Sequence, residues 1–442
     1  MIENAVILAG GRGTRMEALL GDLPKPMAEL NGKPLLLHQI ELCKKYGITK
    51  FLFLTHYRSE VIEEYFGDGS SFGVQIQYHR ELSPLGTAGA VLDAWAKLPS
   101  RFFLLYGDTY LTVDLGKFHD FHLRENAEMS LLLHPNDHPY DSDILEIDDS
   151  KRVVAVHPYP HSPDRDLPNL VNAALYLFEK EALSPWRGTE ATPFDFGKHL
   201  FPSAVKRRSR ISGYQSADFI KDIGTPQRLE KVSQLISSRK IGPDIGNCAC
   251  PAVFIDRDGT LTNQTGYVTS PDQIELVPFA AQAIRRLNES RILSILVTNQ
   301  PVIARGDCSF EDLQKIHNRL ECLLGKSHAY LDRIYFCPHH TDRGFPGERK
   351  ELKVECSCRK PQPGMLFRAE AEMGVDLKKS WFIGDTTVDM EAARRAGVKS
   401  CLVKQGLAGM DGKYAGKPDF EFPNFAAAVD FILSHRGNEN DH

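Results

Sequence analysis

Short apolar runs alternate with amphipathic stretches along the first half of the chain. The apolar runs are bounded by turn residues and predict strands at 5–8, 51–55, 74–78 and 102–105. The stretches between them carry apolar residues at helical spacing and predict helices at 35–46, 60–66 and 88–98, with another at 225–239. This alternation is typical of a mostly parallel sheet covered by helices on both faces, so the expected fold class is α/β.

The same pattern restarts after a segment rich in glycine and proline. KIGPDIGNCACP has no periodicity and predicts a linker at 241–250. Beyond it, strands are predicted at 253–255, 292–297, 334–336 and 381–383, and helices at 280–287, 311–324, 367–373 and 390–396. We therefore expect two tandem α/β domains, 1–240 and 251–436, and a polar, disordered tail at 437–442. The two halves share no motif, which argues against an internal duplication.

Composition and charge narrow the function classes. The net charge of −5 argues against a general nucleic-acid binder. No window of 18 apolar residues predicts a membrane span, and no basic, apolar leader predicts secretion. The nine cysteines are an odd number, and Cys337, Cys356 and Cys358 cluster, which favours metal binding in a reducing compartment over disulfides. The cytoplasm is the expected location.

The turn after the first predicted strand has the chemistry of an anion site. Gly10, Gly11 and Gly13 would let backbone amides approach an anion closely, and the cations Arg15 and Lys25 follow. The lysine does not stand where a Walker loop would place it, so the site is not a P-loop.

Two carboxylates follow strands elsewhere in the first half. Asp108 comes after the strand at 102–105, and Asp222 ends another apolar stretch. Ligands of open α/β sheets bind beyond the carboxyl ends of the strands, so both side chains should face the glycine turn. Two carboxylates beside a cationic glycine turn favour a polyphosphate bound with Mg²⁺.

Five motifs in this order identify a resemblance that covers roughly residues 1–240. They are LAGGRGTRM, LPKPM, PLGTAGA, YGDTY, and VNAALYLF followed by IKDIGTP. Together they resemble the sugar-phosphate nucleotidyltransferases, the NDP-sugar pyrophosphorylase family. The resemblance implies a Rossmann-like nucleotidyltransferase domain in which a sugar 1-phosphate attacks the α-phosphorus of a nucleoside triphosphate. Positioning and charge neutralisation would supply most of the catalysis.

The resemblance also assigns roles to the residues. The turn Gly10–Gly13 would hold the triphosphate, Arg15 the leaving pyrophosphate, and Lys25 the sugar phosphate or α-phosphate. Asp108 and Asp222 would hold Mg²⁺, Gly86 would lie against base and sugar, and Asn172 would contact the sugar.

One segment departs from the family. Before VNAALYLF the family commonly has Glu-Lys-Pro, which contacts the sugar, whereas this chain reads AVHPYPHSPDRDLPN. His157 or His161 could substitute, and each also fits a solvated loop. HPYDSDIL, at 138–145, fits either a pocket segment or a plain turn. The base is left open, because the family includes guanylyl-, cytidylyl-, uridylyl- and thymidylyltransferases.

The second half begins with VFIDRDGTLT, which places two carboxylates after a strand. Asp256 and Asp258 are two residues apart and should point the same way. Like charges aimed at one point repel unless a cation lies there, so a divalent metal is expected, with one aspartate free as nucleophile and the other as acid and base. Thr298, Lys360 and Asp385 follow in LVTNQ, CRKPQPGM and WFIGDTTVD.

This order of motifs resembles the haloacid dehalogenase-like phosphatases over roughly residues 251–435, a Rossmannoid fold. The resemblance implies that Asp256 attacks the phosphate, that Asp258 protonates the leaving alcohol and then activates water, and that Thr298 and Lys360 hold the phosphoryl group. Asp385 would bind Mg²⁺ with Asp256 and the backbone carbonyl of Asp258. The remaining assignments are Asp389 as an outer or alternative ligand, and Asn299 and Arg359 as substrate-binding residues.

A cysteine-rich insert predicts a second metal. Cys337-x-His339 is followed after 16 residues by Cys356-x-Cys358, two close pairs that suit tetrahedral, structural Zn²⁺. His340 is a rival to His339, and free thiols on a loop are the simpler alternative.

The insert, GYV and TNQ…IARG resemble the heptose-bisphosphate and histidinol-phosphate phosphatases. Pro301 and Val302 depart from the usual TNQSGIARG, and Thr386 stands where Gly-Asp is often followed by lysine. The two resemblances imply successive steps: D-glycero-D-manno-heptose 1,7-bisphosphate to the 1-phosphate, then GTP to GDP-heptose and pyrophosphate. A cytidylyl- or other transferase with a different sugar or polyol phosphate, and a binding or regulatory protein with a degenerate transferase domain, are the alternatives.

Overall fold

The computed structural model describes residues 2–11, 13–162, 165–189, 193–238, 241–242 and 250–439. It divides into two compact units: unit 1 is Met1–His134, Asp141–His161 and Leu170–Asn247, and unit 2 is Pro135–Tyr140, Ser162–Asn169 and Cys248–His442. Most of the predicted linker, residues 243–249, lies outside the described residues, so its bounds stay a prediction.

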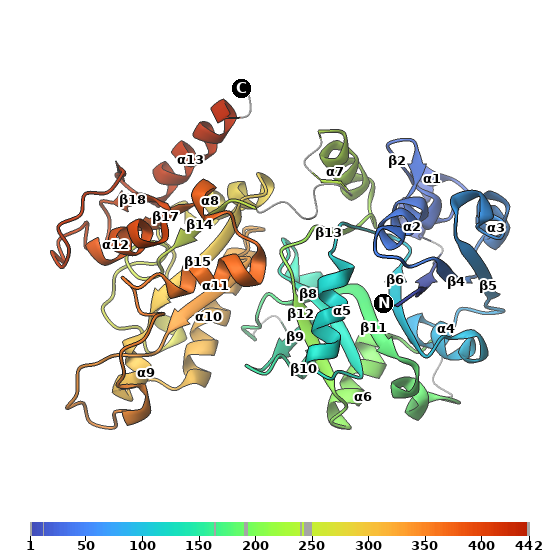
Figure 1. The fold of residues 1–442 in the computed structure, drawn as a ribbon, viewed down its shortest axis with the longest axis horizontal. Coiled ribbons are helices and arrows are strands. Elements are labelled where there is room, and N and C mark those ends of the chain that lie inside the picture. The colour runs from blue at the N-terminus through green and yellow to red at the C-terminus, as the bar shows by residue number, and fades with distance from the viewer. Residues whose placement is uncertain are drawn as a thin grey trace. The chain divides into compact units, whose positions relative to one another are not determined.

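A nine-stranded mixed sheet forms the centre of unit 1 (Figure 1). Its strands are β1 (Asn4–Leu8), β4 (Lys50–Thr55), β5 (Gln75–Arg80), β6 (Arg101–Tyr106), β8 (Met129–His134), β9 (Ile144–Ile147), β10 (Val153–His157), β11 (Val171–Glu179) and β12 (Ile211–Gln215). The main order is β10-β9-β11-β6-β1-β4-β5, and β8 pairs with β11 and β12. Strands β6, β1, β4 and β5 are parallel, so their carboxyl ends meet at one edge.

The central strands of unit 1 are apolar throughout, so both faces of the sheet pack against buried apolar side chains. In β1, Ala5 and Ile7 belong to one core cluster and Val6 to the other. The helices of unit 1 are α1 (Glu17–Leu20), α2 (Leu35–Lys45), α3 (Ser59–Phe66), α4 (Thr87–Asp93), α5 (Leu115–Arg124), α6 (Phe201–Lys206) and α7 (Pro226–Ser237). Helix α4 ends at Asp93, earlier than predicted, and a short 3-10 turn, Trp95–Lys97, follows it. Leu98 is extended, since Pro99 disfavours helical backbone at the residue before it.

Two small sheets shape the site of unit 1. Strands β2 (Glu29–Leu30) and β3 (Lys33–Pro34) form a hairpin, and β7 (Thr109–Leu111) pairs antiparallel with β13 (Ile220–Asp222). The second pairing sets Asp222 opposite Thr109, the residue after Asp108. Asp108, which precedes β7, and Asp222, which ends β13, are thereby brought together although they are more than a hundred positions apart in the chain.

A six-stranded parallel sheet forms unit 2. Its strands are β14 (Ala252–Ile255), β15 (Leu293–Asn299), β16 (Arg333–Cys337), β17 (Trp381–Gly384), β18 (Lys399–Val403) and β19 (Phe420–Phe422), in the order β16-β15-β14-β17-β18-β19. All four residues of β14 are buried. Because β14 lies between β15 and β17, the residues that follow these three strands converge at one edge.

The helices of unit 2 are α8 (Ala280–Glu289), α9 (Pro301–Arg305), α10 (Phe310–Gly325), α11 (Gly364–Met373), α12 (Thr387–Ala396) and α13 (Phe425–Glu439). Helix α10 begins with a capping box, in which the Ser309 side chain accepts from the Asp312 amide and Asp312 reaches back to the Ser309 amide. Helix α13 continues to Glu439, so the first residues of the predicted polar tail extend a helix instead of being disordered. Among the described residues, no helix combines the length and apolar character needed to span a bilayer.

Two segments from the first half of the chain, 135–140 and 162–169, belong to unit 2. They are joined to each other, since the Asn136 amide donates to the Asn169 side chain and the Asn169 side chain donates to the Asn136 carbonyl. They also hold α10: the Asn169 amide donates to Glu321, and the Tyr140 hydroxyl donates to the Cys322 carbonyl at 2.8 Å.

Candidate active sites

The side chain of Lys25 packs closely against the glycine turn of unit 1. Gly13 has φ +67°, and a Cβ there would lie 2.6 Å from Cγ of Lys25. A Cβ on Gly10 would lie 3.1 Å from both Oε1 of Glu81 and Cβ of His56, whereas Gly11 has open space. Gly13 is therefore favoured both by close approach and by its left-handed backbone, whereas a side chain at Gly10 would need only a small shift of Glu81 and His56.

The predicted cations of unit 1 converge. Nζ of Lys25 lies 3.0 Å from Oδ2 of Asp108. A Cβ on Gly224 would lie 3.5 Å from Nη2 of Arg15 and 3.6 Å from Nζ of Lys25. The two cations and Asp108 thus gather where the chain leaves β13, as their positions after the strands predict.

Asp222 is held by a residue that the sequence patterns did not single out. Nη1 of Arg228, in the first turn of α7, donates to both carboxylate oxygens of Asp222 at 2.7 and 2.8 Å, and the Gly224 amide donates at 3.0 Å. Burial acts to raise the pKa of Asp222, but Arg228 and Gly224 oppose it and the net pKa is lowered. In the sequence, the only indication of this contact was that Arg228 lies in the helix that follows IKDIGTP.

Gly86 and Asn172 stand on separate elements of unit 1. Gly86 has φ +82° and begins α4, where a Cβ would meet the Phe194 backbone at 2.6 Å. Asn172 lies in β11, and its amide donates to the Asp143 carbonyl. His157 is bonded to Glu146 at 2.6 Å, so the structure gives its imidazole a partner on the neighbouring strand. His161 lies near Asp143, whose pKa is raised mainly by burial.

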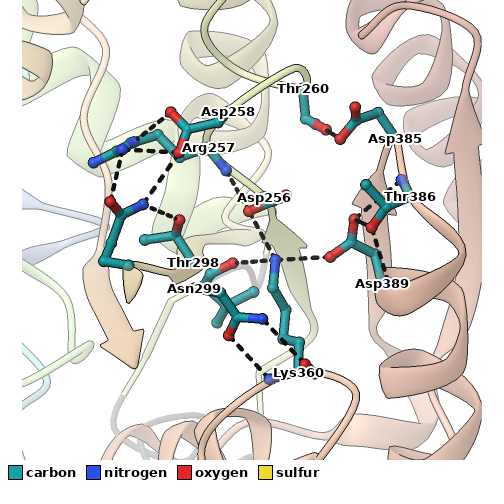
Figure 2. Close-up of polar contacts among 12 residues, drawn as sticks. Asp256, Arg257, Asp258, Thr260, Thr298, Asn299, Lys360, Asp385, Thr386 and Asp389 are labelled. Atoms are coloured by element: carbon teal, nitrogen blue, oxygen red, sulfur yellow. Dashed lines mark hydrogen bonds and ion pairs between the residues drawn. The ribbon is translucent and has the colours of Figure 1, made fainter. Parts of the chain in front are cut away.

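In unit 2, one lysine joins the predicted nucleophile to a second carboxylate. Nζ of Lys360 lies 2.7 Å from Oδ1 of Asp256 and 2.7 Å from Oδ1 of Asp389, and it donates to the Val297 carbonyl (Figure 2). Burial of Lys360 lowers its pKa, but the two carboxylates outweigh burial and raise it. The lysine therefore remains a cation between two anions.

Three carboxylates of unit 2 could hold one metal ion. Asp256, Asp385 and Asp389 each place an oxygen within 4.8 Å of the other two. Burial raises the pKa of Asp385 to about 6. The pKa of Asp256 is also raised, by burial and by the charges of Asp389 and Asp385, although Lys360 opposes this rise. Buried like charges at this spacing suit Mg²⁺, which takes oxygen ligands.

Asp258 faces a different partner from its neighbour. Its two oxygens accept from Nε and Nη2 of Arg257 at 2.8 Å each, and Nε2 of Gln300 donates to it at 3.1 Å (Figure 2). Its side chain is therefore outside the carboxylate cluster. Arg257 is fully buried, and like Gln300 it was not predicted. Its position between the two aspartates of DRDG was the only local signal.

Thr298, Asn299 and Arg359 lie next to the lysine or its loop. The Thr298 hydroxyl accepts from Gln300 at 2.7 Å. The Asn299 side chain accepts from the Lys360 amide and donates to its carbonyl, and Arg359 donates to the His339 carbonyl. Asn299 therefore fixes the backbone that carries Lys360, and direct contact of Asn299 or Arg359 with substrate stays a prediction.

The cysteine-rich insert brings four donors together. Cys337, His339, Cys356 and Cys358 place their ligand atoms within 4.8 Å of one another, with sulfur contacts of 3.2 to 3.6 Å. Tetrahedral Zn²⁺ with bonds of about 2.3 Å holds two sulfurs roughly 3.8 Å apart, so the donors fit it. Contact with Cys337 lowers the pKa of Cys358, which favours the thiolate. His340 lies outside this group and accepts from the Asp342 amide.

The residues that depart from the usual phosphatase motifs have structural roles. Pro301 and Val302 are buried in the first turn of α9. Thr386 caps α12 in a capping box: its side chain accepts from the Asp389 amide, and its hydroxyl donates to Oδ2 of Asp389 at 2.6 Å. Thr386 therefore helps to aim Asp389 at Lys360.

Comparison with known proteins assigns each half. The family model described as Nucleotidyl transferase matches residues 4–239, and the HAD-hydrolase-like model matches residues 357–428. A D-glycero-D-manno-heptose-1,7-bisphosphate 7-phosphatase of Thermosynechococcus vestitus is 38% identical over 190 residues, which cover 42% of this chain and 96% of that protein. A mannose-1-phosphate guanylyltransferase of Mycobacterium tuberculosis is 33% identical over 226 residues. That match covers 51% of this chain and only 62% of the guanylyltransferase.

Among solved structures, the D,D-heptose 1,7-bisphosphate phosphatase of B. bronchiseptica, crystallised with magnesium and phosphate, is similar to part of the chain. The two sequences are 30% identical, and the match covers 42% of this chain and 99% of the phosphatase chain, with a TM-score of 0.38.

Proposed function

The chain belongs to the nucleotidyl transferase family in its first half and to the heptose-bisphosphate phosphatase family in its second, and we propose that it makes a nucleotide sugar in two steps. The phosphatase step removes the 7-phosphate of D-glycero-D-manno-heptose 1,7-bisphosphate. The transferase step joins the resulting 1-phosphate to a nucleotide from GTP, giving GDP-heptose and pyrophosphate. The proposal rests on one observation: a single chain holds two sites, and the product of the phosphatase reaction is a substrate of the transferase reaction.

In the phosphatase step, an oxygen of Asp256 attacks the phosphorus and the sugar oxygen leaves, taking a proton from Asp258. Asp258 then removes a proton from water, which attacks the aspartyl phosphate and releases phosphate and the carboxylate. Lys360 is 2.7 Å from Asp256 and would hold the phosphoryl oxygens while the negative charge on them changes during the transfer. Arg257 and Gln300 hold Asp258, so they would fix the direction of proton transfer.

In the transferase step, an oxygen of the sugar 1-phosphate attacks the α-phosphorus and the bond to the β-phosphate breaks. The glycine turn, Arg15 and Lys25 would hold the phosphates in line, which converts the reaction to an effectively unimolecular one. The convergence of Arg15 and Lys25 on Gly224 supports this assignment. Both substrates are small molecules.

Two metals complete the proposal. Mg²⁺ would bind Asp256 and Asp385 in one site and Asp108 and Asp222 in the other, and would neutralise phosphate charge there. Zn²⁺ would bind Cys337, His339, Cys356 and Cys358. It would be structural, since four protein ligands leave no open position. Reduced thiols and a nucleoside triphosphate substrate both favour the cytoplasm.

The choice of GTP is supported by a carboxylate that the sequence patterns missed. Glu81 is buried, and its Oε1 lies 3.1 Å from the Cβ position of Gly10, beside the predicted phosphate turn. Its Oε2 accepts from the Leu85 amide, which leads into PLGTAGA. Guanine offers two adjacent donors, N1–H and the N2 amino group, which a carboxylate can accept as a pair. The guanylyltransferase relative points to the same base.

The test is a product analysis with each nucleotide in turn. The enzyme is incubated with the 1,7-bisphosphate, Mg²⁺ and one of four NTPs, and the products are weighed by mass spectrometry. Phosphate, pyrophosphate and GDP-heptose in one pot would support the proposal. If only CTP gives a nucleotide sugar, the guanylyl assignment fails. If the bisphosphate is inert and a polyol phosphate is consumed, the heptose assignment fails as well.

A further inference from the structure

Asp143 occupies a fixed position beside the predicted sugar contact of unit 1. It immediately precedes β9, and its carbonyl accepts from the Asn172 amide at 3.0 Å. One carboxylate oxygen, Oδ1, accepts from the Tyr159 amide at 2.9 Å. The side chain is thus anchored by the very segment that replaces the family's Glu-Lys-Pro.

The other carboxylate oxygen faces a glycine. A Cβ on Gly197 would lie 1.8 Å from Oδ2 of Asp143, so the position next to this oxygen admits only glycine. Within the described residues, no group donates a hydrogen bond to Oδ2. Burial raises the pKa of Asp143, while the Tyr159 amide and Lys198 oppose that rise. An acceptor without a protein donor in a half-buried setting is suited to a ligand donor.

The turn that carries Gly197 also holds the predicted base and sugar turn at Gly86. The Phe194 carbonyl accepts from the amides of Ala88 and Gly89, each at 2.9 Å. The Asp195 carboxylate accepts from the Thr87 amide and hydroxyl at 3.1 and 3.3 Å. The contacts therefore run from Gly86 through this turn to Asp143 and on to Asn172, so Asp143 lies between the two predicted ligand contacts.

A tyrosine of the same region lies near both Asp143 and Asn172. Tyr176 is fully buried in β11, and its pKa is shifted by burial as well as by the side chains of Tyr106 and Asn172. Its ring packs edge-on against Tyr106 at the end of β6, with centroids 5.9 Å apart. The charge of Asp143 raises the pKa of both tyrosines, which places the carboxylate close to them.

We propose that Asp143 is a specificity-determining residue of the transferase site, whose carboxylate accepts hydrogen bonds from hydroxyl groups of the sugar 1-phosphate. The inference rests on the proposed function. Adjacent sugar hydroxyls are donors that one carboxylate can accept together, and hydrogen bonds to a charged group are the strong ones. His157 cannot take this role without leaving Glu146.

The test compares Asp143→Asn with Asp149→Asn in the full-length enzyme. Asp149 is exposed in the same hairpin, so its variant carries the same charge change away from the site. Asp143→Asn should raise KM for the sugar 1-phosphate by about tenfold or more, because an amide offers one acceptor in place of two. KM for the nucleotide and phosphate release from the bisphosphate should change less than about twofold in both variants.

A second variant keeps the carboxylate and displaces it. Gly197→Ala should raise the same KM, because its methyl group would occupy the place of Oδ2. An unchanged KM for the sugar 1-phosphate in both variants would overturn the inference, as would an equal rise in KM for the nucleotide. If the wild-type enzyme uses none of a panel of sugar 1-phosphates, the proposed function itself fails. If it uses one and the variants match it, only the role of Asp143 fails.

Discussion

Lys360 organises the charges of the phosphatase site. Its ammonium group lies 2.7 Å from both Asp256 and Asp389, and Asn299 fixes its backbone from both sides. A buried carboxylate next to two others would otherwise take up a proton and lose its nucleophilic form. Lys360 opposes the rise that burial causes in the pKa of Asp256, and a divalent ion held by the carboxylates would favour the ionised, nucleophilic form further.

Replacing the nucleophile should separate the two activities. Asp256→Asn should lower phosphate release by about a thousandfold or more, since an amide cannot form the acyl phosphate. Synthesis of the nucleotide sugar from an authentic sugar 1-phosphate should stay within about twofold. Both rates are measured on the purified full chain, with thermal unfolding as the check on folding.

The reciprocal control is Asp222→Asn, which removes the carboxylate held by Arg228. It should abolish pyrophosphate release and leave the phosphatase nearly intact. A folded Asp256→Asn protein that has lost both activities would contradict independent sites. Asp222→Asn that retains more than about a tenth of the transferase rate, a loss under ~1.4 kcal/mol, would remove Asp222 from the metal site.

At the scale of helices and strands, most of what could be predicted followed from the local pattern of the sequence. Strands such as β14 and β17 are short, wholly apolar runs, and α10 carries both a capping box and helical spacing, so each was readable without its neighbours. The capping box Thr386-x-x-Asp389 was equally local and would have shown how Asp389 is aimed.

Pairings between distant side chains could not be predicted in this way. The spacing of Asp256 and Asp258 implied a shared direction, yet Asp258 turns to Arg257 and Gln300 because a buried guanidinium needs a partner. Asp143 meets Gly197 only because a hairpin and a helical turn far apart in the chain come together. Such contacts depend on the fold as a whole, and no periodicity encodes them.

The cysteine-rich insert at 337–358 is the element whose stability is easiest to test. Purified protein should contain about one Zn²⁺ per chain by metal analysis. Cys356→Ala should lose the ion and lower the unfolding temperature of unit 2, because binding of structural zinc is part of the folding free energy. Phosphatase activity should fall too, since the Arg359 amide donates to the Cys356 sulfur and Lys360 is the next residue.

His340→Ala is the matched control for the insert. His340 lies in the same loop but outside the four donors, so its variant should keep the full zinc content. Fresh, reduced wild-type protein without zinc would contradict the structural metal. Loss of zinc in His340→Ala with retention in a His339→Ala variant would reassign the fourth ligand.

At the scale of the whole molecule, the two compact units are each built from more than one segment of the chain. Segments 135–140 and 162–169 lie within the nucleotidyl transferase match but belong to unit 2. Besides the Glu321 and Tyr140 contacts, Asn318 of α10 donates to the Asp166 carbonyl, and Arg319 forms an ion pair with Asp166. We therefore expect a chain cut at 240 to leave α10 without these contacts.

Glu321 makes this attachment sensitive to pH. Its carboxylate accepts from the Asn169 amide, and burial raises its pKa from 4.5 to about 7. An acid whose pKa is raised by folding binds more protons in the native state, so stability falls as pH rises from about 4.5 to about 7 and stays lower above that. At pH 8 the buried charge costs up to about 3 kcal/mol, and this cost disappears as the pH falls below the unfolded pKa of 4.5.

Glu321→Gln should remove that cost while keeping an oxygen for the Asn169 amide. The variant should unfold several degrees higher than wild type at pH 8, since each kcal/mol shifts the unfolding temperature by roughly 2–4 °C in a unit of this size. At pH 4 the two proteins should unfold within about a degree of each other, because the carboxyl is then largely protonated in both the folded and the unfolded state. The control is Glu311→Gln, an exposed acid in the first turn of the same helix, which should show no such difference between the two pH values. Equal gains from Glu321→Gln at both pH values would mean that the residue acts through packing and that its charge has no part in holding segment 162–169.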